Sequence, residues 1–157
     1  MLKKLFFICM SAMLLVLLSF AVVSAAPASI PANVSTSGNL ITVTNPPSFS
    51  TTTQKGVVFC GYGQSGTKLY FYEYNSSSNT YTPIIADGEH VSLTINSSGV
   101  FWKKINFNSG YHKVIVYAET DSQSQSVKRE INVITPDIVD RIKGFSVNVN
   151  GLVKKGI

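Results

Sequence analysis

Clusters of turn-forming residues cut this sequence into short runs, and their spacing limits the possible folds more than any other feature. Gly, Pro, Asn, Asp and Ser gather at Asn45–Pro47, Gly61–Gly66, Asn75–Asn79, Asp87–Gly88, Asn96–Gly99, Asn108–Gly110 and Asp121–Ser124. The runs between these clusters are rich in Val, Ile, Thr, Tyr and Phe, which favour strands. Short strands separated by turns at such intervals predict an all-β sandwich or barrel.

The sequence predicts one strand in each run. The expected strands are 40–44, 56–61, 68–74, 81–84, 90–95, 100–107, 112–119 and 126–135. Several alternate with period two, as half-buried strands do: Leu69 and Phe71 share one face of their strand, and Tyr70 lies on the other. Because many short strands pack economically in two layers, we expect an antiparallel two-sheet sandwich over residues 38–135.

Residues 1–25 have the three parts of a secretory signal peptide. Lys3 and Lys4 precede an apolar block that ends in small residues, and we expect cleavage after Ala25. The block is also long enough to span a bilayer, so an uncleaved anchor is the alternative. In both cases the lysines hold the N-terminus in the cytoplasm and the rest lies outside. We therefore expect an extracellular or cell-envelope protein, with a membrane contact only through an uncleaved N-terminal segment.

The segments that flank the expected sandwich have different compositions. Residues 26–37 are small, polar and contain proline, which is typical of a linker. In residues 136–157, Pro136 and Asp137 favour a short helix over 137–143, and an alternating, strand-like run follows. We expect this C-terminal segment to form a short helix or strand that is not a domain of its own.

Few side chains are available for catalysis. Once Cys9 has left with the signal peptide, Cys60 has no partner for a disulfide within the domain, and we expect it to be a small buried residue. His90 and His112 lack metal-ligand spacing and are expected at the surface, on strand edges. The chain is therefore expected to be neither an enzyme nor a cofactor-binding protein.

The charged residues indicate whether the chain could bind calcium or nucleic acid. Asp87–Glu89 and Glu119–Asp121 each place two carboxylates in a loop, which would bind Ca²⁺ only if further oxygen ligands converged there. We expect no metal site. The formal net charge of +5 falls to +3 without Lys3 and Lys4, and the other basic residues are scattered, so we expect no nucleic-acid partner.

Parts of the expected sandwich resemble bacterial immunoglobulin-like domains of secreted or cell-surface proteins. From Gly99 to Ala118 the chain has a Gly-x-Phe entry, an apolar strand, a turn at Gly110 and an alternating strand that ends in Ala. Upstream, Phe59–Gly61 and Gly66–Phe71 are similar to a strand, a glycine turn and the next strand of those domains. The resemblance implies an immunoglobulin-like two-sheet antiparallel β-sandwich with a spacer or adhesion role.

An aromatic stripe is the feature with most binding character. Its expected residues are Tyr70, Tyr72, Tyr74, Tyr81 and Trp102. The first three share the strand face opposite the core, so their rings are expected on the outer surface of a sheet, where they suit stacking on sugars or anchoring a protein. The alternative is that tyrosine simply favours strands, or that the C-terminal segment covers this face.

These observations lead to three hypotheses about function. The first is a non-catalytic module that presents a rigid surface, binding a cell-envelope polysaccharide or an extracellular protein. The second is a carbohydrate-binding protein that uses the tyrosine stripe. The third is an inhibitor of an extracellular enzyme that acts through the loop Asn75–Asn79.

Overall fold

The computed structural model describes residues 26–135, so the expected signal peptide and the expected helix over 137–143 lie outside the described residues. Within this range every regular element is a strand. The strands are β1 (Ile30–Pro31), β2 (Ile41–Asn45), β3 (Phe49–Thr52), β4 (Gly56–Gly63), β5 (Lys68–Asn75), β6 (Thr80–Pro83), β7 (Ile85–Ala86), β8 (Glu89–His90), β9 (Ser92–Thr94), β10 (Val100–Asn106), β11 (Gly110–Glu119) and β12 (Ser124–Val133). None of the described residues belongs to a helix that could cross a membrane.

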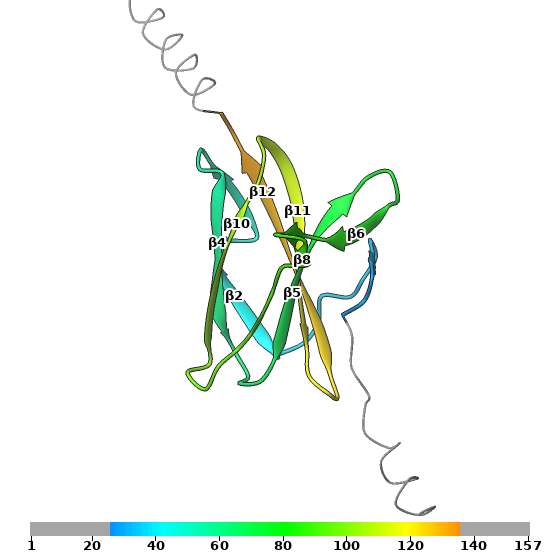
Figure 1. The fold of residues 1–157 in the computed structure, drawn as a ribbon, viewed down its shortest axis with the longest axis vertical. Coiled ribbons are helices and arrows are strands. Elements are labelled where there is room, and N and C mark those ends of the chain that lie inside the picture. Colours follow the sequence, from blue (N-terminus) through cyan, green and yellow to red (C-terminus); the bar gives the residue numbers. More distant parts are fainter. Residues whose placement is uncertain (1–25, 136–157) are drawn as a thin grey trace, which may run out of the picture.

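The strands form two main sheets and a small hairpin (Figure 1). The seven-stranded sheet has the order β1-β6-β5-β11-β12-β3, and β9 also pairs with β5. The three-stranded sheet has the order β10-β4-β2, and β7 pairs with β8. All pairs are antiparallel except β12 with β3, which is parallel. The prediction of an all-β, sandwich-like fold is therefore confirmed.

One hydrophobic core lies between the two main sheets. Phe59, Phe101 and Ile105 enter it from the three-stranded sheet, and Leu69 and Phe71 enter it from the seven-stranded sheet. Phe59 and Phe71 meet edge to face, with their ring centroids 5.4 Å apart. The period-two alternation of the sequence therefore identifies the inward face of these strands correctly.

A second, smaller cluster lies on the outer face of the seven-stranded sheet. We call it the tyrosine cluster: Ile30, Tyr72, Tyr81 and Ile115 are buried in it, and Val34, Tyr70, Tyr74 and Tyr117 pack against them. Ile30 belongs to the segment 26–37, which was expected as a linker. Instead, this segment contributes β1 and lies over the sheet. Removing the apolar surface of the tyrosine rings from water is favourable, so packing of the segment on the rings stabilises the fold.

The observed strands differ from the expected ones mainly near β4. The turn expected at 61–66 begins later, because β4 continues to Gly63. A Cβ atom at Gly61 would lie 2.0 Å from the carbonyl oxygen of Thr42 in β2, so the glycine permits close strand approach rather than a turn. By contrast, Asp87 and Gly88 do form the turn between β7 and β8, both with positive φ, as a two-residue hairpin connection requires.

Candidate functional site

The expected aromatic stripe does not form one exposed surface. Tyr72 is fully buried, Tyr81 is 5% exposed, and Tyr70 and Tyr74 are half-buried in the tyrosine cluster. The hydroxyl group of Tyr72 donates to the carbonyl oxygen of Pro27 at 2.7 Å, which holds the N-terminal segment on the rings. The four tyrosines of the expected ligand face are thus buried or half-buried, and part of the segment 26–37 packs against them.

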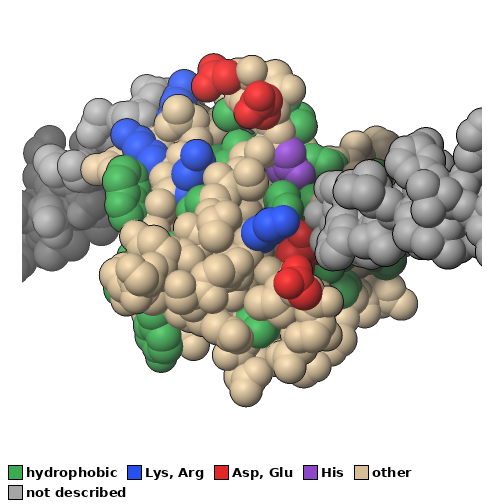
Figure 2. Space-filling model, turned by 60° about the horizontal axis from the view of Figure 1, so that its bottom comes forward, with side chains coloured by type: hydrophobic (Ala, Val, Ile, Leu, Met, Phe, Trp, Pro, Cys, Tyr) green, Lys and Arg blue, Asp and Glu red, His purple; other side chains and the backbone are tan. Residues whose placement is uncertain are grey.

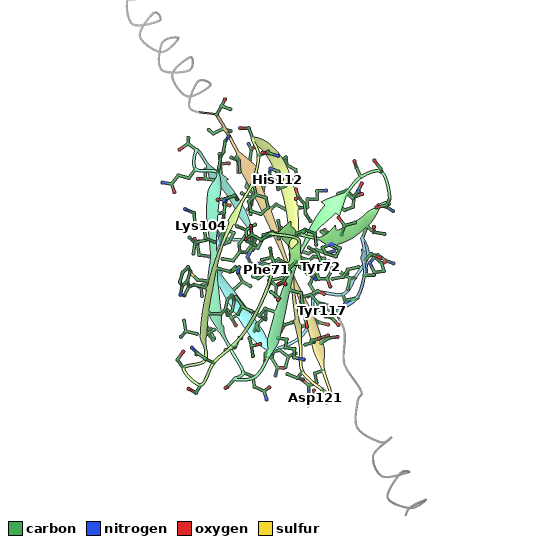
Figure 3. All side chains as sticks on the ribbon, in the orientation of Figure 1. Phe71, Tyr72, Lys104, His112, Tyr117 and Asp121 are labelled. Carbon is green, nitrogen blue, oxygen red and sulfur yellow. The ribbon has the colours of Figure 1, made fainter. Side chains whose placement is uncertain are left out.

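Side-chain directions explain this correction. In Figure 3 Phe71 points between the sheets, whereas Tyr72 and Tyr117 point toward the N-terminal segment. Burial raises the pKa of Tyr72, with the neighbouring Tyr117 and Glu119 adding to the effect, and burial also raises the pKa of Tyr81. The strand alternation is as predicted, but the outer face of β5 is covered at Tyr72 and half-buried at Tyr70 and Tyr74.

Trp102 lies on the other side of the molecule. It belongs to β10 in the three-stranded sheet and is 71% exposed. Its cross-strand partner is Cys60, and the flanking pairs are Val100 with Tyr62 and Lys104 with Val58. Directly opposite residues of an antiparallel pair have Cβ atoms about 4.5–5.5 Å apart, so these side chains form one continuous surface.

We call this surface the Trp102 face. Its residues are Val58, Cys60, Tyr62, Val100, Trp102 and Lys104. Tyr62 and Val100 are each 56% exposed, so apolar area gathers here on the outer face of a sheet. Figure 2 shows hydrophobic and basic side chains on the left of the molecule, the side on which β4 and β10 lie. Exposed apolar side chains grouped in this way mark interaction sites more often than single ones do.

A shallow hollow of about 490 Å³ adjoins the Trp102 face beside Tyr62. Its polar lining includes Asn39, Gln64 and Ser98. These side chains can donate and accept hydrogen bonds next to the tyrosine ring. The surface therefore combines flat aromatic area with polar groups at one end.

Sequence reasoning included Trp102 but missed its neighbours. Tyr62 was assigned to the turn at 61–66, and the alternation of Val58, Cys60 and Tyr62 in β4 was the signal that would have placed it on the outer face. Cys60 itself is half-buried rather than part of the core, and its Sγ atom lies 3.7 Å from Thr44 Oγ1. It sits near the centre of the Trp102 face.

Both histidines are packed against neighbours, unlike the surface residues expected. His112 is 13% exposed, its Nδ1 atom lies 2.5 Å from Glu73 Oε1, and its Nε2 atom lies 2.9 Å from the carbonyl oxygen of Asn108. His90 Nε2 lies 3.0 Å from the carbonyl oxygen of Phe71. The nitrogens that would act in acid–base chemistry therefore hold strands together.

The carboxylate pairs remain separate pairs. Within 26–135 no three His, Cys, Asp or Glu side chains lie close enough together to hold a metal ion. Asp87 is exposed on the β7–β8 turn, and Asp121 is exposed at the end of β11 (Figure 3). Glu119, which precedes that end, is only 6% exposed, so it belongs to the packed outer face rather than to an open loop.

The loop Asn75–Asn79 is a small polar turn between β5 and β6. Asn79 has a φ of 53°, and its Oδ1 atom accepts a hydrogen bond from the hydroxyl group of Tyr74 at 2.8 Å. The three central residues, 76–78, are all serines, so the loop has no large side chain that could anchor it in an enzyme cleft.

Comparisons with known proteins add no family to this description. No protein-family model and no curated protein sequence matches the chain. The candidate site therefore rests on the geometry of the Trp102 face.

Proposed function

We propose that this protein is an exported, non-catalytic immunoglobulin-like module that binds a partner outside the cytoplasm through its Trp102 face. The observation that carries the proposal is the exposure of Trp102 and Tyr62, at 71% and 56%, on one outer sheet face. Neither ring contributes to the core, whereas Tyr72 and Tyr81 of the other sheet are buried in the tyrosine cluster with Ile30 of the N-terminal segment. Large exposed aromatic rings at one place are typical of binding surfaces.

The strand order supports the immunoglobulin-like assignment. In such sandwiches the first, second and fifth strands share one sheet, and the third, sixth and seventh share the other. Here β2, β4 and β10 take the places of the first, second and fifth strands and form one sheet. The strands β5, β11 and β12 take the places of the third, sixth and seventh, and they lie side by side in the other sheet. The N-terminal residues 1–25 support export through their composition.

Retention on cell-envelope material tests the binding role. The full-length protein is expressed in a bacterial host, its location and its N-terminal sequence are determined, and its retention on isolated envelope material is compared with that of Trp102→Ala and Tyr62→Ser variants. We expect both variants to lose at least about fivefold in retention, as loss of a binding hot spot does.

Phe49 provides the matched control, because it is 61% exposed but belongs to β3 in the other sheet. Phe49→Ala is expected to be retained like the wild type. Equal retention of Trp102→Ala and the wild type would contradict the binding role and favour structural presentation instead. Recovery of the protein in the cytoplasm would contradict export.

A further inference from the structure

The carboxylates of the described residues are unevenly distributed between the two main sheets, whereas basic residues lie on both. The carboxylates of the described residues are Glu73, Asp87, Glu89, Glu119, Asp121 and Glu130, and none of them lies on β2, β4 or β10. The three-stranded sheet instead carries Lys103 and Lys104, and Lys55 lies directly before β4. The potential over this sheet is therefore positive and favours an anionic partner.

Lys104 brings this charge to the Trp102 face. It lies two residues from Trp102 on the same side of β10, which is about 7 Å along a strand. Its stem lies across β4, since a Cβ atom at Gly56 would be 2.2 Å from Lys104 Cε. Figure 3 shows Lys104 on the outer side of the three-stranded sheet. Lys55 is exposed at the same end of the sheet, opposite the core residue Phe107, whose N–H group donates to the Lys55 carbonyl oxygen at 2.8 Å, so Lys55 adds to the charge of this end without belonging to the Trp102 face.

The Trp102 face thus changes in character along its length. Lys104 occupies the end where β4 starts, Trp102 occupies the middle, and Tyr62 and the polar hollow of Asn39, Gln64 and Ser98 occupy the other end. The surface is flat and open, so it suits an extended ligand better than a compact one. Such a ligand needs apolar ring faces for the aromatic side chains, hydroxyl groups for the hollow and negative charge for the lysines.

We propose that the Trp102 face binds an acidic polysaccharide. Sugar rings stack on Trp102 and Tyr62, hydroxyl groups of the polymer bond to the side chains of the hollow, and its anionic groups lie beside Lys104. This inference rests on the proposed function and adds the class of partner. Sugar rings satisfy all three requirements at once, because they have apolar C–H faces and hydroxylated edges and can carry carboxylates.

A matched pair of polymers tests the charge of the ligand. Binding of the full-length protein to polygalacturonate is compared by affinity electrophoresis with binding to its methyl-esterified, uncharged form. We expect tighter binding to the acidic form, and we expect the difference to shrink as salt concentration rises, because exposed charges are screened. Equal binding to both forms, or no binding to the acidic form, would overturn the inference.

Substitutions separate the lysines from the aromatic rings. Lys104→Gln keeps most of the side-chain stem and is expected to weaken binding to polygalacturonate by about two- to fivefold, the range of an exposed ion pair. Lys68→Gln is the control, since Lys68 is an exposed lysine of β5 in the other sheet. Trp102→Ala is expected to weaken binding to polygalacturonate by at least about fivefold.

Other partners give different outcomes. Binding to polyglutamate or single-stranded DNA as tight as binding to polygalacturonate would overturn the inference, as would a dimer in solution that Trp102→Ala dissociates. In these cases the envelope-retention experiment still decides the proposed function separately. If Trp102→Ala reduces envelope retention while acidic and neutral polymers bind equally, the binding role stands and the acidic ligand class is wrong.

Discussion

Gln125 in β12 and Ile41 in β2 are joined by two hydrogen bonds across the opening between the two sheets. Ile41 N donates to Gln125 Oε1 at 2.9 Å, and Gln125 Nε2 donates to the carbonyl oxygen of Ile41 at 3.1 Å. The side chain thereby replaces the strand that would otherwise satisfy this backbone group. Arg129, further along β12, makes a similar contact: its Nη2 atom donates to the carbonyl oxygen of Val43 in β2 at 2.6 Å.

Replacing Gln125 by Leu is expected to destabilise the fold. Gln125 is 6% exposed, so the substitution leaves Ile41 N and O buried without partners, at a cost of about 1–3 kcal/mol for each unsatisfied group. Urea denaturation measures the change in the free energy of unfolding. The control is Gln123→Leu, because Gln123 is exposed in the turn before β12. Similar stability of the two variants would show that the side-chain bridge contributes nothing.

Replacing Ile30 by Ala tests whether the N-terminal segment is part of the fold. Ile30 is 3% exposed in the tyrosine cluster, so its truncation is expected to lower the free energy of unfolding by about 2–5 kcal/mol. Ser29→Ala, at an exposed neighbouring position, is the control and should change stability little. A plain linker would tolerate both substitutions equally in thermal or urea unfolding.

Tyr72 makes stability depend on alkaline pH. Burial raises the pKa of its hydroxyl group above the value in the unfolded chain, which is about 10. The folded state therefore holds its proton more tightly, and this contribution to stability is complete below about pH 10 and is lost as the pH rises above it. Tyr72→Phe removes both this dependence and the hydrogen bond to Pro27.

The two curves of stability against pH should therefore converge. Below pH 10 the wild type is expected to be more stable than Tyr72→Phe by about 0.5–1.5 kcal/mol, the usual contribution of one hydrogen bond. Above pH 10 the difference should narrow as the wild type loses its advantage. Urea denaturation at a series of pH values measures it, and a constant difference through the alkaline range would contradict the assignment.

Phe101 and Trp102 are adjacent residues, and replacing them by Ala is expected to change stability by very different amounts. Phe101 is 3% exposed in the core, so Phe101→Ala should cost about 3–5 kcal/mol. Trp102 is 71% exposed, so Trp102→Ala should change the free energy of unfolding by no more than about 0.5 kcal/mol. Chemical denaturation of both variants checks this. A large loss of stability in Trp102→Ala would mean that the ring serves folding rather than binding.

Local patterns predicted the central strands well and the short edge strands poorly. Turn residues and alternation placed β5, β10 and β11 within one or two residues of their observed bounds. The strands β1 and β3 were missed, since segments as short as Ile-Pro and Phe-Ser-Thr-Thr show no periodicity of their own and pair only because a long neighbour is already in place. Tyr62 was left out of the candidate face for a related reason, because the expected strand ended at Gly61 whereas β4 continues to Gly63.

The sequence by itself determined the all-β class and the inward face of each long strand, because alternation and turn chemistry act between near neighbours. Only the tertiary structure decided which outer face stays open to solvent. Tyr72 and Trp102 look equally available in the sequence, yet Tyr72 is buried with a hydrogen bond to Pro27, 45 residues earlier, and Trp102 is 71% exposed. Such coverage depends on contacts between distant parts of the chain, and no local pattern of side chains encodes them.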